Sequence, residues 1–107
     1  MVLRIASVNT NGVRAAYRKG MGDWLADRDV DILALQEVRA DTADLTGLLG
    51  DRLHVFHDAA LAKGRAGVAL ASRVDGAARA PELHCVALGG EEAQTSGRWL
   101  EADYLVG

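Results

Sequence analysis

The chain has 107 residues, of which 50% are hydrophobic and 25% are charged, and its formal net charge is −3. A chain of this length forms one small domain at most and buries about two thirds of the surface that it exposes when unfolded. It has no repeats and no Pro/Ser-rich linkers, which excludes a disordered or multi-domain layout. Its apolar runs stay well short of the roughly 20 residues that cross a bilayer. The single Cys85 cannot form an internal disulfide, so we expect a globular protein of the reducing cytoplasm with no membrane partner.

Two apolar strands joined by a helical stretch begin the chain. Residues 3–8 and 30–35 are almost entirely apolar, which is typical of buried strands. Between them, apolar residues recur at the spacing of one helical face: Tyr17, Met21, Trp24 and Leu25. Gly20 and Gly22 weaken this helix by up to about 1 kcal/mol each, so we expect it to start late or to bend. A strand, a helix and a strand in this order bring the carboxyl ends of both strands to one edge of a sheet.

Shorter elements follow the second strand. Asp41 or Thr42 is suited to cap a helix that runs to Leu49 and ends at Gly50. We expect residues 77–81 to be irregular, and we expect strands at residues 54–57, 68–72, 83–88 and 99–104. This order of elements predicts an α/β (α+β) fold, in which a mixed sheet carries helices on one face.

A polar residue that could bind a metal ion follows each of the first two strands. These residues are Asn9 and Glu37, and the shared edge of the sheet predicts that both face one cleft. Mg²⁺ prefers hard oxygen ligands and usually takes only one or two protein carboxylates, which suits Glu37. Taken alone, each residue also has an ordinary explanation: Glu37 as a solvated carboxylate at a strand end, and Asn9 as a turn residue.

Four segments, in this order, resemble the endonuclease/exonuclease/phosphatase family, and within it the exonuclease III type of abasic-site DNA repair nuclease. They are SVNTNGVRA at residues 7–15, LQE at 35–37, GVAL at 67–70, and a weaker match that begins with EEAQ at 91–94 and continues through Gly97 to the strand ending at Tyr104. The resemblance covers about the first half of that family's catalytic domain. It implies that residues 1–107 are a single partial domain, the N-terminal half of a four-layer β-sandwich flanked by helices. It also implies that the second sheet comes from residues that this chain lacks.

The resemblance assigns roles to the residues at the strand ends. It implies a Mg²⁺-dependent phosphodiesterase, with Mn²⁺ as an alternative cation, in which Glu37 binds the metal. Asn9 lies beside both the metal and the scissile phosphate, as a metal and catalytic residue. Asn11 is a further candidate metal ligand, although a turn role before Gly12 explains it as well.

Basic residues in two places resemble the family's contacts with double-stranded DNA. Arg14 matches a position that contacts backbone phosphate, and Arg18 and Lys19 extend the same track, while Lys63 and Arg65 lie in a loop near the DNA. Guanidinium groups bind phosphate through two parallel hydrogen bonds. A solvated helix start explains the first three residues equally well, and the net charge of −3 is not the basic balance of most nucleic-acid binders.

Several groups that the family's reaction needs are missing from the sequence. It contains neither an Asp-x-Asn nor a Ser-Asp-His segment, and the three histidines fit strand or surface positions: His54, His57 and His84. We therefore expect the chain alone to be inactive without the C-terminal half of the domain. Two alternatives remain open: a phosphatase of the same fold acting on a phosphate monoester or phospholipid, and a non-catalytic α/β binding module.

Overall fold

The computed structural model describes residues 2–50, 52–61, 64–79, 97 and 100–105. Its elements in chain order are β1 (Ile5–Asn9), α1 (Val13–Arg18), α2 (Met21–Arg28), β2 (Ile32–Gln36), α3 (Thr42–Leu49), β3 (His54–Asp58), β4 (Val68–Ser72), β5 (Gly76–Arg79) and β6 (Glu101–Tyr104). None of the helices in these ranges has the length and apolarity needed to span a membrane.

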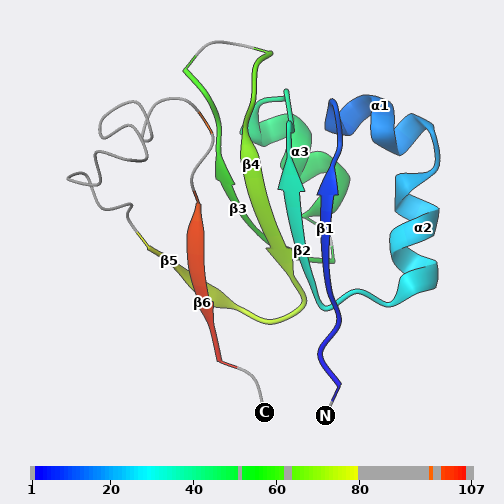
Figure 1. Ribbon diagram of the computed structural model, residues 1–107, viewed down its shortest axis with the longest axis vertical. Coiled ribbons are helices and arrows are strands. Elements are labelled where there is room, and N and C mark those ends of the chain that lie inside the picture. The colour runs from blue at the N-terminus through cyan, green and yellow to red at the C-terminus, as the bar shows by residue number, and fades with distance from the viewer. Residues whose placement is uncertain (1, 51, 62–63, 80–96, 98–99, 106–107) are drawn as a thin grey trace.

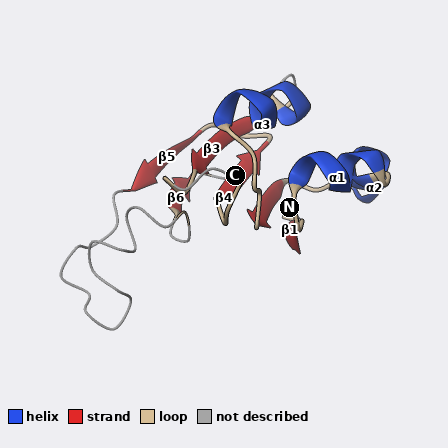
Figure 2. Ribbon diagram, turned by 90° about the horizontal axis from the view of Figure 1, so that it is seen from above, coloured by secondary structure: helices blue, strands red, loops and turns tan. Residues whose placement is uncertain are grey.

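The main sheet has four strands in the order β1-β2-β4-β3 (Figure 1). Strands β1 and β2 are parallel, in a register that runs from Ile5 opposite Ile32 to Asn9 opposite Gln36. Strand β4 is antiparallel to both β2 and β3. Seen from above, all three helices lie on one side of this sheet (Figure 2). The predicted mixed sheet with helices on one face is therefore confirmed.

The hydrophobic core lies between the helices and the sheet. Leu33 and Leu35 of β2 are each 1% exposed, and they pack with Ala69 and Ala71 of β4. Helices α1 and α3 contribute fully buried side chains to the same cluster: Val13 and Leu45. Burial of one leucine side chain stabilises a fold by about 1.5–3 kcal/mol, so this layer fixes the position of the strand ends.

The helical predictions are confirmed in their main features. The expected bend is a complete break, because Gly20 adopts φ +104° between α1 and α2. Asp41 caps α3, since its Oδ1 accepts a hydrogen bond of 2.8 Å from the Asp44 N–H, and Gly50 follows the last helical residue.

The prediction of irregular structure at residues 77–81 is wrong for residues 77–79, because Gly76–Arg79 forms strand β5. Residues 80 and 81 lie outside the described residues. Strand β5 pairs with β6 in a separate two-stranded sheet, beginning with Gly76 opposite Tyr104. The backbone of this chain thus supplies part of a second sheet, contrary to the expectation that the missing residues supply all of it. Sequence reasoning missed β5 because its partner lies more than 20 residues away, so no local turn marks the pair. The strand expected at 83–88 lies outside the described residues.

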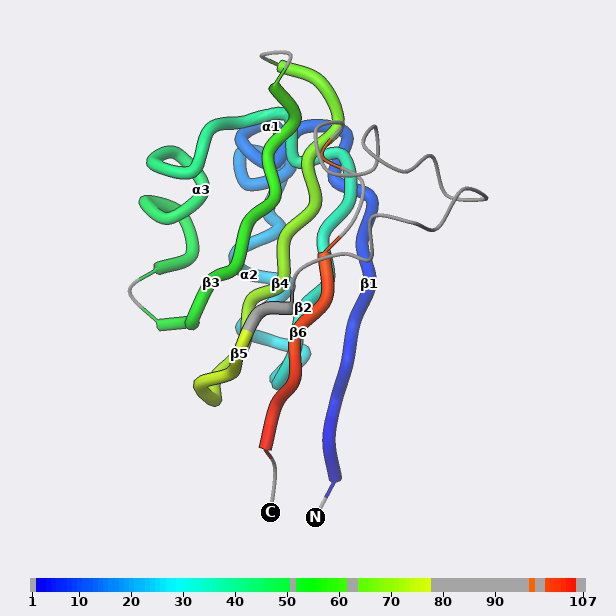
Figure 3. The backbone as a smooth tube through the Cα atoms, turned by 90° about the vertical axis from the view of Figure 1, so that its left-hand side faces the viewer, coloured from blue at the N-terminus to red at the C-terminus, as the bar shows by residue number. Residues whose placement is uncertain are grey.

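The small sheet lies over the β3 and β4 side of the main sheet, beside the face that the helices leave open (Figure 3). The ring of Tyr104 contacts the ring of Phe56 on β3. Strand β4 has the expected bounds, Val68–Ser72. The other predicted strands shift by one or two residues at one or both ends, and β1 and β2 each extend by one residue at their carboxyl ends, to Asn9 and Gln36.

Candidate functional site

A cleft of about 650 Å³ opens at the carboxyl ends of β1 and β2. Its lining comes from four stretches of the chain: Asn9, then Gln36, Glu37 and Arg39, then Gly64, Arg65, Ala66 and Val68, and finally Gly97. Asn9 and Glu37 thus line one cleft, as the strand–helix–strand pattern predicts. Their chemical roles stay predictions.

Asn9 is held at the last register position of β1. Its partner across the sheet is Gln36, and the N–H of the next residue, Thr10, donates to the Gln36 carbonyl at 2.9 Å. The Asn9 Oδ1 accepts a hydrogen bond of 3.1 Å from the Asn11 N–H, which is the local turn that asparagine favours. One lone pair of Oδ1 is therefore committed to the turn, and Asn9 is among the residues that line the cleft.

The backbone of Glu37 is fixed by hydrogen bonds from the segment after β1. The Gly12 N–H donates to the Glu37 carbonyl at 2.8 Å, and the Thr10 hydroxyl donates to the same oxygen at 2.8 Å. The next residue, Val38, is fully buried and donates its N–H to the Gly67 carbonyl at 3.0 Å. The Glu37 side chain is 40% exposed and pairs with Arg39, with 3.2 Å between Oε2 and Nη2.

Left-handed backbone conformations gather around this cleft. Five non-glycine residues of the described chain have positive φ, and four of them surround the strand ends: Asn11 (46°), Glu37 (48°), Arg39 (52°) and Ala66 (44°). Such conformations cost of order 1–3 kcal/mol each and persist where surrounding contacts enforce them, often at active sites. The strain therefore supports this cleft as the functional site.

Two glycines allow a distant segment to close the cleft. The Gly67 N–H donates to the Gly97 carbonyl at 2.8 Å, and both glycines adopt positive φ. A Cβ atom on Gly97 would lie 2.4 Å from the Ala60 nitrogen, so no other residue fits there without backbone movement. This contact brings residue 97 next to the loop that precedes β4.

The predicted DNA contacts fall into three groups: residues that line the cleft or a neighbouring hollow, exposed residues that line neither, and one residue outside the described part of the chain. Arg65 lines the cleft, and Lys19 lines a neighbouring hollow of about 430 Å³ that also includes Asn9 and Asn11. Arg14 lines neither and forms an ion pair with Asp44 at 3.3 Å. Arg18 lies at the exposed end of α1, away from the lining of both hollows, and Lys63 lies outside the described residues.

Sequence reasoning missed two residues of the cleft. Gln36 donates from its Nε2 to the Ser7 hydroxyl at 3.0 Å, across β1 and β2. Arg39 was missed because its position in the cleft depends on the turn that follows β2, which the sequence does not indicate. The available signal was that Arg39 is the first cationic residue after Glu37. Within the described ranges no group of three or more His, Cys, Asp or Glu side chains could hold a metal, so Glu37 is the carboxylate that the cleft offers.

The histidines of β3 stand apart from the cleft, as expected for strand residues. His57 Nδ1 lies 2.9 Å from the Thr42 hydroxyl, and its buried Nε2 has no hydrogen-bond partner in the described part of the chain. Burial lowers the pKa of the His57 imidazole from its ordinary value. His54 is exposed and lies 3.8 Å from Asp75, while His84 lies outside the described residues.

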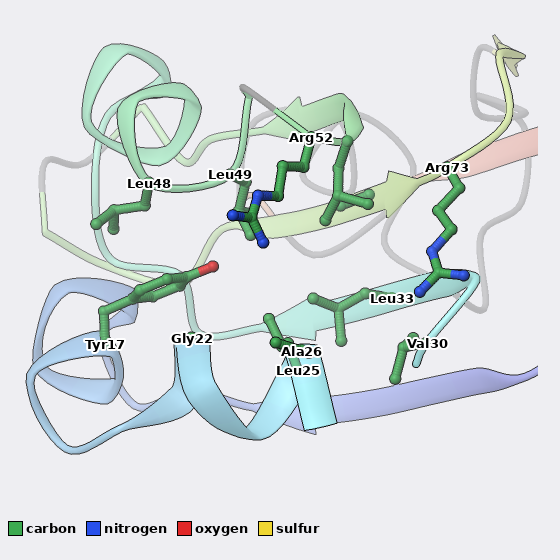
Figure 4. A pocket seen from close by; sticks show the side chains of 12 residues that line it. Tyr17, Gly22, Leu25, Ala26, Val30, Leu33, Leu48, Leu49, Arg52 and Arg73 are labelled. Atoms are coloured by element: carbon green, nitrogen blue, oxygen red, sulfur yellow. The ribbon is translucent and has the colours of Figure 1, made fainter. Parts of the chain in front are cut away.

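A third hollow, of about 330 Å³, lies between α2 and α3 (Figure 4). Its lining is mainly aliphatic and includes Leu33 and Leu49, with Arg52 and Arg73 at its edges. Arg73 is already paired with Asp29 and with Asp31. No carboxylate is among the described residues that line this hollow, so it lacks the oxygen donors that the cleft at the strand ends provides.

Comparisons with known proteins agree with this fold. Residues 6–91 match the Endonuclease/Exonuclease/phosphatase family, and the chain therefore belongs to that family. It is 30% identical over 106 residues to the DNA repair nuclease APEX1 of Danio rerio, a match that covers 95% of this chain and 33% of that protein.

Solved structures show the same similarity. An AP endonuclease from Archaeoglobus fulgidus superposes with a TM-score of 0.76 at 26% identity, covering 96% of this chain and 37% of that one. The catalytic domain of Xenopus laevis APE2 gives a TM-score of 0.66 at 21% identity, over 90% and 37% of the two chains, and shows the fold alone. The chain thus has an exonuclease III-like fold, and it spans about a third of the length of these relatives.

Proposed function

We propose that residues 1–107 are one partial domain of a metal-dependent DNA phosphodiesterase, an abasic-site endonuclease or a 3′–5′ exonuclease. The observation that carries the proposal is the convergence of Asn9 and Glu37 on one strained cleft at the strand ends. The relatives support the substrate class, since they are named as a DNA repair nuclease and an AP endonuclease. The expected cytoplasmic location stays a prediction.

The cleft offers oxygen ligands, the type of donor atom that a hard divalent cation prefers. Glu37 offers a carboxylate and Asn9 a carboxamide oxygen, and Mg²⁺ and Mn²⁺ both bind oxygen ligands of this type. A bound cation would polarise a phosphoryl oxygen and stabilise the charge that develops during hydrolysis. One carboxylate and one amide are few ligands for a cation that is strongly hydrated, so binding to this chain is weak.

The chain's own residues would bind and orient the phosphate. The Asn9 amide would donate from its NH₂ group to a phosphoryl oxygen, since Asn9 lines the cleft and its Oδ1 is engaged by the Asn11 N–H. Arg65 lines the same cleft and supplies a guanidinium fork for the neighbouring phosphate. The base that deprotonates the attacking water is expected in another segment of the domain.

Double-stranded DNA would extend from the cleft over the basic residues of α1 and the loop before β4. Lys19 shares a hollow with Asn9, which supports a phosphate contact close to the site. Arg14 is 59% exposed in its ion pair with Asp44, and exposed pairs of this kind contribute only about 0–1 kcal/mol. Arg14 can therefore exchange its carboxylate for a phosphate at small cost, with Arg18 as an outer contact. Lys63 stays a predicted DNA contact outside the described residues.

Cation binding to the chain tests this proposal directly. Two-dimensional amide NMR with Mn²⁺ should show broadening around Asn9 and Glu37, with a dissociation constant of about a millimolar or weaker. Glu37→Gln should abolish the broadening. The control Asp27→Asn, which removes the same charge from an exposed position on α2, should retain it. Broadening that survives Glu37→Gln would place the cation site elsewhere and overturn the proposal.

A further inference from the structure

The ion pair between Glu37 and Arg39 lies inside the proposed cation site. Both side chains line the cleft, and their charged groups are 3.2 Å apart. The Arg39 side chain is 46% exposed and that of Glu37 is 40% exposed. Pairs with this exposure contribute little to folding stability, so the contact has no evident structural need.

The backbone on either side of this pair is rigid. Arg39 donates its N–H to the Ala66 carbonyl at 2.8 Å, and Val38, between the two residues, is fully buried. Glu37 and Arg39 both adopt left-handed backbone conformations, which turn the two side chains into the same cleft. Only rotation of the side chains can therefore separate the guanidinium from the carboxylate.

Arg65 provides an internal comparison. It also lines the cleft, yet no ion pair joins it to a carboxylate in the described part of the chain. Two guanidinium groups thus share one cleft, and the one from Arg39 neutralises Glu37.

We propose that Arg39 is the internal counter-ion of Glu37 and competes with a divalent cation for its carboxylate. This inference rests on the proposed function. A guanidinium beside a carboxylate occupies its lone pairs and repels a second cation, so Arg39 weakens cation binding in the absence of substrate. When a cation binds Glu37, Arg39 is released into the cleft that also holds Asn9, where its free guanidinium favours a phosphate. Cation and phosphate then strengthen each other's binding by thermodynamic linkage.

Mn²⁺ titration of four proteins tests the competition: the wild-type chain and the variants Arg39→Gln, Arg39→Lys and Arg65→Gln. Arg39→Gln should tighten Mn²⁺ binding by about two- to fivefold, the factor that corresponds to an exposed ion pair. Arg39→Lys keeps a cation beside Glu37 and should stay near the wild-type affinity. Arg65→Gln removes the same charge from the same cleft and should change the affinity by less than about twofold. Thermal unfolding of each variant checks that the fold is retained.

The outcomes separate this inference from the proposed function. Mn²⁺ binding that depends on Glu37 but is unchanged or weakened in Arg39→Gln would overturn the counter-ion role and leave the cation site standing. If Arg65→Gln tightens Mn²⁺ binding as much as Arg39→Gln does, the effect comes from the total positive charge of the cleft. That result would also overturn the specific counter-ion role of Arg39. Absence of binding near Glu37 in every variant would overturn both. With a short DNA duplex added, Mn²⁺ affinity should rise more in the wild type than in Arg39→Gln, because only the wild type has this guanidinium to release.

Discussion

The ring of Phe56 on β3 lies 6.5 Å from the ring of Tyr104 on β6, with an angle of 44° between the ring planes. Aromatic pairs at this separation contribute about 0.5–1.5 kcal/mol beyond the area they bury. The pair joins the main sheet to the small sheet. The Tyr104 hydroxyl is buried without a hydrogen-bond partner among the described residues, and burial raises the pKa of Tyr104.

Substitution of Tyr104 should separate the contribution of the ring from that of the hydroxyl. Tyr104→Phe keeps the ring and removes an unsatisfied buried group, so the free energy of unfolding should be unchanged or should rise by up to about 1 kcal/mol. Tyr104→Ala should lower it by about 1–3 kcal/mol. Urea denaturation measures both values. An equal loss in the two variants would show that the hydroxyl has a hydrogen-bond partner.

Two glycines should respond in opposite ways to alanine. Gly47 lies within α3, and nothing lies within 4 Å of the position that a Cβ atom would take there, so Gly47→Ala should stabilise the fold by up to about 1 kcal/mol. Gly97→Ala should destabilise it by more than about 2 kcal/mol, because the new Cβ would meet the Ala60 nitrogen at 2.4 Å. Thermal unfolding of the two variants makes the comparison. A neutral Gly97→Ala would contradict the tight approach of residues 97 and 60.

Stability should fall at acidic pH partly because of His57. Burial holds the pKa of its imidazole below the ordinary value of 6.5, against the opposing influence of Asp58 and Asp41. The unfolded chain therefore binds this proton more readily than the folded chain does. The contribution of neutral His57 to the free energy of unfolding is fully present above pH 6.5. It is lost as the pH falls toward the lower pKa of His57 in the folded chain. His57→Gln should flatten this part of the curve of unfolding free energy against pH, and an unchanged curve would contradict this role of His57.

The chain alone should not cleave DNA. Electrostatic stabilisation and positioning provide most of the acceleration in phosphoryl transfer. The described lining of the cleft supplies one carboxylate, one asparagine, one glutamine and two arginines. Incision of a duplex containing an abasic site, assayed with Mg²⁺, should remain at background. Cation-dependent incision by protein freed of contaminating nucleases, and its loss in Glu37→Gln, would show that these few groups suffice.

Association through β1 should limit the solubility of the chain. β1 is an outer strand of the main sheet, and on it Ile5 is 62% exposed, beside exposed Val2 and Leu3. Open apolar strand edges promote pairing between chains. We expect concentration-dependent oligomers in analytical ultracentrifugation, and Ile5→Lys should reduce them without loss of the fold. A wild-type chain that stays monomeric at high concentration would contradict this expectation.

The sequence predicted the parts of the fold whose signals are local. The apolar runs of β1 and β2, the Asp41 cap of α3 and the weakness of the helix at Gly20 each depend on neighbouring residues, and each is confirmed, although the expected bend at Gly20 is a complete break. The shared cleft of Asn9 and Glu37 followed from the parallel connection of two strands. Strand β5 and the role of Arg39 could not be predicted in this way. Both depend on contacts between residues that become neighbours only after folding.

The hydrogen bonds from Val38 to Gly67 and from Arg39 to Ala66 set the order in which the cleft can form during synthesis. Asn9 and Glu37 leave the ribosome long before residues 66 and 67, and residue 97 follows later still. Until β4 docks, the Glu37 turn lacks the partners that enforce its left-handed conformation. A nascent chain can therefore pair β1 with β2 and still have no cation site. Under the proposed function, binding of a cation would therefore wait until the antiparallel part of the sheet is in place.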